Sequence, residues 1–114
     1  MQLYRIEISE LAAQDLEDIG DYIAFTLKNS RAAVNTIRGI RKKINTLKHF
    51  PERNGLDKDI RLAAFGVRAE LYRSYKIYYI VRQAIIYVVR ILHRLVNGRV
   101  WLYQALSKEK TVIE

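Results

Sequence analysis

The chain has 114 residues, half of them apolar, which suits one domain over residues 1–114 and leaves little room for two. With no cysteine, no apolar run of membrane-spanning length and no secretory signal, the sequence excludes disulfides, thiolate metal sites and cysteine catalysis, and we expect a cytoplasmic protein. Lysine and arginine number 20 against 12 acidic residues, a net charge of +8 that favours an acidic or polyanionic partner.

The charge is divided unevenly along the chain. The first 27 residues hold one arginine and six acidic residues, a charge of −5, so the remaining 87 residues carry +13. We therefore expect an acidic surface and a basic surface that serve different ends.

The first half of the chain predicts a strand followed by two helices. Leu3 to Ile8 alternates between apolar and polar residues, the period of a half-buried strand. Ser9 then has the chemistry of a helix N-cap, and apolar residues recur at helical spacing as far as Leu27. After a polar break at residues 28–30, a second amphipathic helix runs until Pro51 stops it. Because the break is short, the two helices should form an antiparallel hairpin.

The second helix is basic on the faces that its apolar stripe leaves free. No acidic residue occurs between residues 28 and 51. The cations on those faces are Arg31, Arg38, Arg41, Lys42, Lys43 and Lys48.

The second half of the chain predicts strands. Residues 52–59 are polar and contain Asn54-Gly55, so they indicate a loop. Residues 60–72 are apolar around Gly66, which predicts a strand from about Val67 and allows a shorter strand before the glycine. Residues 75–82 and 84–92 are rich in Ile, Val and Tyr, with a tight turn at Arg82-Gln83. The fold class is α+β in the order β-α-α-β-β-β, an antiparallel sheet packed against the N-terminal antiparallel helical hairpin.

Two structures stay open for the C-terminal tail, residues 99–114, and the segment just before it. Asn97-Gly98 has the chemistry of a turn between two further strands, whereas residues 102–110 are compatible with a short helix.

Four polar residues in the strand region are candidate site residues. Arg90 lies within an apolar run, where it needs a partner: either Glu70 or a tyrosine hydroxyl pairs with it structurally, or its planar guanidinium faces a groove and holds an anion. Arg68 poses the same question. His93 ends the last clear strand beside Arg94, where an imidazole acts either as a general acid or base or as an ordinary surface histidine.

The sequence shows no metal-binding or cofactor-binding motif. Its two histidines, His49 and His93, are 44 positions apart and form no metal-ligand pattern, so we expect neither a metal nor a cofactor.

Tyrosines cluster in the predicted sheet, where they are either ordinary strand residues or a platform on which unpaired bases stack. Alternation along the strand places Tyr75 and Tyr79 on one side and Tyr78 on the other, so only half of the cluster can face one partner.

A set of ordered segments is similar to a known family. In chain order they are Leu3-Tyr4-Arg5-Ile6, Asp15-Leu16 with Ile19 and Tyr22-Ile23, Leu47 through Phe50-Pro51, Gly66-Val67-Arg68, Tyr75-Lys76-Ile77-Tyr78-Tyr79 and Arg90-Ile91-Leu92-His93. In this order and spacing they resemble the RelE/ParE superfamily of toxins from type II toxin–antitoxin systems, over about residues 3–94. The long hairpin and the last two segments look more like the ParE branch.

The resemblance implies a small α+β fold and a cognate antitoxin whose C-terminal segment wraps the toxin. Ribonuclease members of the superfamily cut messenger RNA in the ribosomal A site, whereas ParE-like members poison DNA gyrase. The leading hypothesis is therefore a gyrase inhibitor that is not itself an enzyme. The alternatives are a ribosome-dependent endoribonuclease and a degenerate, non-toxic binding module.

The resemblance also gives the candidate residues their expected roles. In the ribonuclease alternative, Arg68 and Arg90 stabilise the charge on phosphorus and His93 transfers a proton. The set expected to bind the target or an anion is Arg68, Arg90, His93 and Arg94. We expect an acidic or amphipathic antitoxin segment to lie over the sheet and the basic second helix. Its expected contacts are Arg31, Arg38, Arg41 and Lys42.

Overall fold

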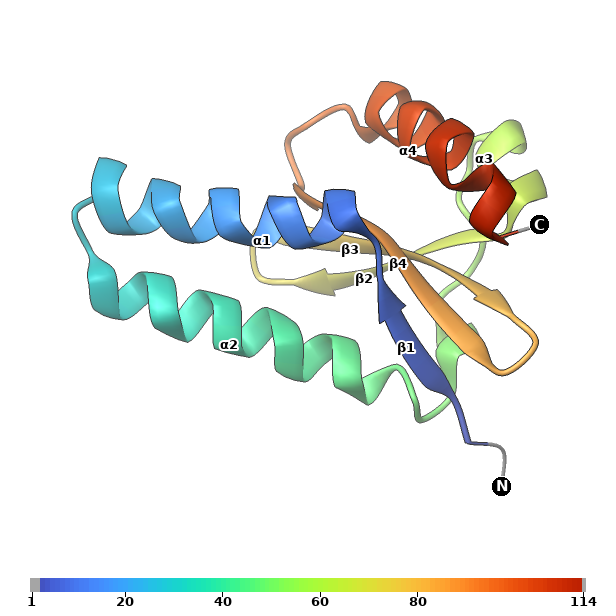
Figure 1. Ribbon diagram of the computed structural model, residues 1–114, viewed down its shortest axis with the longest axis horizontal. Helices are drawn as coiled ribbons and strands as arrows, with labels where there is room; N and C mark the ends of the chain where they lie inside the picture. The colour runs from blue at the N-terminus through green and yellow to red at the C-terminus, as the bar shows by residue number, and fades with distance from the viewer. Residues whose placement is uncertain (1–2, 114) are drawn as a thin grey trace.

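The computed structural model describes residues 3–113, with side chains described as far as residue 107 (Figure 1). Its elements are β1 (Arg5–Ile8), α1 (Glu10–Asp21), α2 (Ser30–Thr46), α3 (Ile60–Phe65), β2 (Val67–Tyr72), β3 (Tyr75–Arg82), β4 (Ile85–His93) and α4 (Gly98–Ile113). The expected α+β class and the order β-α-α-β-β-β are confirmed, and α3 and α4 are additions to it. Within the described residues, no helix combines the length and the apolar character that crossing a membrane requires.

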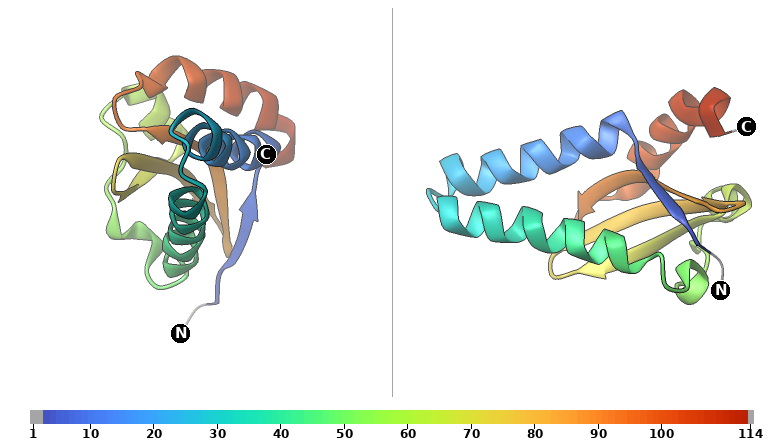
Figure 2. Two further views of the ribbon diagram at one scale, coloured as in Figure 1. Left: turned by 90° about the vertical axis from the view of Figure 1, so that its left-hand side faces the viewer. Right: turned by 60° about the horizontal axis from the view of Figure 1, so that its bottom comes forward.

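The helical hairpin forms as its capping residues predict. The hydroxyl of Ser9 accepts a hydrogen bond from the backbone N–H of Ala12 at 3.0 Å and so caps α1. A π-helical turn, Tyr22–Thr26, extends α1 to the end predicted for it, and Asn29 caps α2 through the N–H of Ala32. The two helices run antiparallel, and their connected end projects beyond the sheet (Figure 1 and the right-hand view of Figure 2).

The sheet has the strand order β1-β4-β3-β2. The pairs formed by β2 with β3 and by β3 with β4 are antiparallel, as expected. The pair formed by β1 with β4 is parallel, so the expectation of a wholly antiparallel sheet was wrong at this edge. Alternation along a strand shows which residues share a face, but it does not show which neighbour the strand joins.

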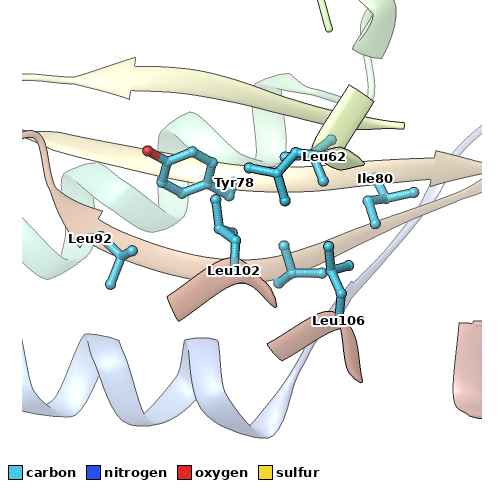
Figure 3. Packing of buried hydrophobic residues seen from close by; sticks show 8 residues of the cluster. Leu62, Tyr78, Ile80, Leu92, Leu102 and Leu106 are labelled. Carbon is cyan, nitrogen blue, oxygen red and sulfur yellow. The ribbon is translucent and has the colours of Figure 1, made fainter. Parts of the chain in front are cut away.

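The sheet buries side chains on both faces. On one face, the hairpin face, residues such as Ile77 and Val88 pack against Ile40 and Ile44 of α2 and against α1. The other face, the α4 face, is shown in Figure 3. There the buried side chains are Leu62, Val67, Tyr78, Ile80, Val89, Leu92, Leu102 and Leu106. The sheet is therefore the middle layer of three.

The segment before Gly66 is helical, so the shorter strand allowed there was wrong. Asp59 caps α3 by accepting hydrogen bonds from the backbone N–H groups of Arg61 and Leu62 at 2.9 and 3.1 Å. Gly66 ends the helix with a φ of +85°, a left-handed conformation that glycine adopts without strain. An apolar run of this length is compatible with either a strand or a buried helix.

The C-terminal tail forms a helix that begins at Gly98, so the alternative of a further strand pair was wrong. Leu102, Ala105 and Leu106 are buried, and the two leucines pack on the α4 face. The Tyr103 hydroxyl donates to both carboxylate oxygens of Asp59, at 2.8 and 2.9 Å. The Leu62 N–H and this hydroxyl hold the pKa of Asp59 below its usual range, so the carboxylate that ties α3 to α4 stays charged.

The first prediction concerns two glycines of the hairpin. A Cβ added at Gly39 would lie 1.8 Å from the Tyr72 hydroxyl, whereas one at Gly20 would make an ordinary contact, 3.5 Å from Ile37. Alanine should gain about 1 kcal/mol of helix propensity at each site. We expect Gly20→Ala to raise the free energy of unfolding and Gly39→Ala to lower it by about 1–2 kcal/mol, because Tyr72 must move.

Denaturant titration of both variants measures these changes. A Tyr72→Ala background removes the obstruction, so Gly39→Ala should then be stabilising. Equal stabilisation by both glycine replacements in the wild-type background would contradict the packing described for Tyr72.

Candidate functional site

Arg90 lies on β4 just beyond the end of β1. The parallel pairing of β1 with β4 stops at Ile8 and Val88, and a β-bulge follows in β4. The N terminus of α1 takes over from β1 along this edge. The Ser9 N–H donates to the Val88 carbonyl at 3.0 Å, and the Ser9 hydroxyl donates to the Val89 carbonyl at 3.1 Å.

The partner of Arg90 is Asp15 of α1. The Nε and Nη2 atoms of Arg90 each donate to one Asp15 oxygen, both at 2.7 Å, in a bidentate pair. The Ile91 N–H donates to the same carboxylate at 2.9 Å. Asp15 is only 7% exposed, and it is the one buried charged residue among those that the structure describes. The expected partners, Glu70 or a tyrosine hydroxyl, were therefore wrong, while the structural pairing of Arg90 is present.

Trp101 of α4 completes the surroundings of Arg90. The guanidinium carbon lies 5.4 Å from the centre of the indole ring, within the range of a cation–π interaction. Arg90 thus joins α1, β4 and α4, and two of its five guanidinium N–H groups donate to Asp15.

Glu70 instead holds a polar cluster on the hairpin face. Arg53 donates to it through Nε at 2.9 Å, Asn54 through Nδ2 at 2.9 Å, and the ammonium group of Lys43 lies 3.8 Å away. The Tyr79 hydroxyl donates to the Pro51 carbonyl at 2.6 Å, and burial raises the pKa of that hydroxyl. The cluster fixes the loop after α2 onto the sheet.

Arg68 belongs to the same cluster. Its Nη1 atom donates to the backbone carbonyl of Asn54 and, at 3.5 Å, to that of Glu52. Arg68 thus contacts the loop that the sequence predicted, and it acts there as a donor to two backbone carbonyls.

His93 and Arg94 lie at the far end of β4. The Leu95 N–H donates to Nδ1 of His93 at 3.2 Å, and the imidazole packs edge-on against Tyr75 with ring centres 5.6 Å apart. The backbone N–H of Arg94 donates to the Ser74 carbonyl at 2.7 Å, and the residue is exposed.

The structure does not bring Arg68, Arg90 and His93 together. Arg68 pairs with Tyr79, which is buried on the hairpin face, whereas Arg90 pairs with Tyr78, which is buried on the α4 face. Directly paired residues share a face, so the two arginines lie on opposite faces of the sheet. His93 shares the face of Arg68, but it pairs with Tyr75 at the other end of β3. A phosphate held by one arginine is out of reach of the other.

The tyrosine cluster follows the predicted alternation. Tyr78 and Tyr79 are both buried, on opposite faces, so neither offers a ring on which a base can stack. These side chains are part of the core, as their strand propensity predicts.

Two hollows on the surface are candidate sites. One, of about 670 Å³, is lined by Leu11, Arg90, Trp101, Tyr103, Gln104 and Ser107, so Arg90 both pairs with Asp15 and borders a cavity. The other is a groove along α2. One section has a volume of about 700 Å³ and lies between α1 and α2, with Val34 and Ile37 in its lining beside Arg38, Arg41 and Lys42. A second section, of about 410 Å³, continues between α2 and β1 and shares Arg41 and Asn45 with the first. We call the two sections together the α2 groove. Its apolar lining and basic rim suit an amphipathic, acidic segment.

Three of the four predicted antitoxin contacts line the α2 groove. Arg38, Arg41 and Lys42 do so, whereas Arg31 lies on α2 outside the lining and is exposed. The described side chains contain no group of three or more carboxylates or histidines arranged to hold a metal ion.

Sequence reasoning missed Asp15 and Trp101. Asp15 is one of the six acidic residues for which an acidic surface is expected, although it falls among Ala12, Leu16 and Ile19 at the spacing of the buried stripe. This helical spacing was the signal in the sequence that could have shown that Asp15 is buried. Trp101 gave no such signal, because its contact with Arg90 depends on where α4 docks.

Comparisons with known proteins agree with this fold. The family model described as "ParE toxin of type II toxin-antitoxin system, parDE" matches residues 6–97. The chromosomal ParDE toxin–antitoxin system from P. aeruginosa gives a TM-score of 0.68 at 21% identity, covering 80% of this chain and 96% of that one. The RelBE2 toxin–antitoxin complex from Mycobacterium tuberculosis gives a TM-score of 0.58 at 19% identity, covering 82% of this chain and 94% of that one. No curated protein is similar enough in sequence to count as a match.

The second prediction compares loss of the whole Asp15–Arg90 ion pair with loss of Arg90 alone. Arg90→Ala should lower the free energy of unfolding by about 3–5 kcal/mol, because Asp15 is left as an uncompensated buried charge. The double change Asp15→Asn with Arg90→Met should recover most of that loss. It removes both charges, while the amide oxygen of the replacement side chain still accepts from the Ile91 N–H.

Denaturant titration of the single and double variants measures the difference. Equal destabilisation by the single and double changes would contradict the view that the lone buried charge, and not the missing pair, is what costs stability.

Proposed function

The chain belongs to the ParE toxin family of type II toxin–antitoxin systems, and we propose that it arrests growth by inhibiting DNA gyrase, without being an enzyme itself. The observation that carries this choice of target is the dispersal of the residues that RNA cleavage would need. Arg68 and Arg90 lie on opposite faces of the sheet, and each donates to groups inside the protein. A ribonuclease needs a base, an acid and an anion-binding group around one phosphate.

The surroundings of His93 support a protein target over RNA in a second way. The imidazole packs against Tyr75 and accepts from a backbone N–H, and no carboxylate of the described residues pairs with it. An isolated imidazole offers one half of an acid–base pair. Inhibition of a protein target requires a binding surface and no such pair.

The partner of the chain is an antitoxin, and we propose that it binds in the α2 groove. Arg38, Arg41 and Lys42 are exposed along one rim. In the described residues the one ion pair that α2 makes is that of Lys43 with Glu70, so these three cations are available to an acidic segment. Opposite charges of this kind mainly increase the association rate.

The third prediction tests the target. The purified protein should inhibit supercoiling by gyrase and increase gyrase-dependent DNA cleavage, while messages stay intact when the protein is induced in cells. Primer extension on cellular messages and a supercoiling assay read the two outcomes. His93→Ala should retain substantial toxicity, because no proton transfer is needed.

The rival targets give different results in the same experiment. Discrete cleavage of messages in the ribosomal A site, lost in a folded His93→Ala variant, would establish the ribonuclease alternative. A folded protein that is not toxic without its antitoxin, and leaves both gyrase and messages unaffected, would be a degenerate binding module.

The fourth prediction tests the antitoxin site. Reversing two rim charges, Arg38→Glu with Arg41→Glu, should slow association with the antitoxin by at least about tenfold at low salt and flatten its salt dependence. The matched control is Lys58→Glu with Arg94→Glu, which changes the net charge equally at exposed positions outside the hairpin. Stopped-flow or biosensor kinetics measure both. Equal slowing by the two variants would show that net charge, and not the groove, steers the antitoxin.

A further inference from the structure

The section of the α2 groove that lies between α1 and α2 has a second rim of opposite charge. Gly20 of α1 lines the groove, and the helical period places Glu17 and Asp21 beside it on the outer side of that helix. Arg38 and Arg41 form the rim on α2. All four charged side chains are exposed, and none has an ion-pair partner in the part of the chain that the structure describes.

A surface with an acidic rim and a parallel basic rim is complementary to itself. If a second copy is turned by half a revolution about an axis along the groove, its acidic α1 rim meets the basic α2 rim of the first copy. The same operation brings its basic rim onto the first copy's acidic rim, as a two-fold interface requires. From this self-complementarity we propose that the occupant of the groove in the antitoxin-free protein is a second copy of this chain, in a symmetric dimer of two hairpins.

Apolar side chains at the projecting end of the hairpin support this arrangement. Phe25 is 75% exposed, and Tyr22, Leu27 and Val34 are each more than half exposed. Three of these lie in or next to the π-helical turn that extends α1. This end projects beyond the sheet, so a second hairpin can approach it without meeting a strand (Figure 1 and the right-hand view of Figure 2). Four large apolar groups on one projecting end are typical of an interaction surface.

The net charge of +8 opposes the dimer at long range. At physiological salt the screening length is about 8 Å, so repulsion between distant charges is weakened while rim charges in contact still attract. Because the attraction must offset this residual repulsion, we expect the dimer to form in a concentration-dependent manner.

The dimer has a consequence that rests on the proposed function. Arg38 and Arg41 belong both to the dimer interface and to the proposed antitoxin site, so one copy cannot hold both occupants. The dimer itself is measured without antitoxin or gyrase, so its failure would leave the proposed function standing.

The experiment uses charge reversal on each rim of the full chain. In one variant Glu17→Lys and Asp21→Lys make both rims basic, and in the other Arg38→Glu and Arg41→Glu make both rims acidic. Sedimentation equilibrium, with circular dichroism to confirm folding, should show a dimer for the wild type. Each variant alone should dissociate at least about tenfold more readily, because like charges now meet at every rim contact.

An equimolar mixture of the two variants provides the decisive arm. In a mixed pair, each of the two contacts joins a basic rim of one variant to an acidic rim of the other. The mixture should therefore form a heterodimer more tightly than either variant forms a homodimer. The control Lys58→Glu with Arg94→Glu should dimerise like the wild type. A wild type that stays monomeric at all concentrations, or a mixture that does not restore association, would overturn the proposal.

Discussion

One buried carboxylate connects the three layers of this protein. Asp15 sits where β1 ends and the edge of β4 would otherwise be open, and it accepts from the Ile91 N–H and from both arms of the Arg90 fork. An arginine whose side chain is only 11% exposed and an unpaired strand N–H are each costly without a partner. Because Asp15 satisfies both, α1 can replace β1 along β4, and Trp101 of α4 can stack on the same guanidinium.

The burial of both sheet faces determines where function can lie. α1 and α2 cover one face, and α3 and α4 cover the other, so the polar residues of the strands are used to hold loops and helices in place. Arg68 holds the loop after α2, and Arg82 donates to the Phe65 carbonyl at the end of α3. The surface of the hairpin carries exposed apolar groups and, among the described residues, charged side chains without an ion-pair partner. This distribution favours protein binding by the hairpin over chemistry on the sheet.

Sequence patterns predicted those parts of the fold that depend on local chemistry. Ser9 as a cap and the two-sided alternation around Tyr78 and Tyr79 are each set by neighbouring residues, and both are confirmed. The prediction that the second helix runs until Pro51 was wrong: α2 ends at Thr46, and Pro51 begins a separate 3₁₀ turn, Pro51–Arg53. The helix before Gly66 was missed because a short apolar run has no distinctive period. The parallel edge was missed because strand order depends on packing between distant segments.

The candidate site was predictable only where it depends on local sequence patterns. A cationic α2 is visible in the sequence, and so is an arginine that needs a partner. The partner itself lies 75 residues away, and the charge of Asp15 concealed its place in the buried stripe of α1. The dispersal of Arg68, Arg90 and His93 depends on the sheet register and on a bulge in β4, which no local pattern reveals.

The most direct test of the structural role of Arg90 is the toxicity of the Asp15→Asn, Arg90→Met double variant, measured in cells without antitoxin and compared with its folded fraction. If Arg90 serves structure and the target is bound elsewhere, the folded double variant should be as toxic as the wild type. A double variant that is fully folded and still binds antitoxin, yet has lost toxicity, would show that Arg90 contacts the target and would contradict this role.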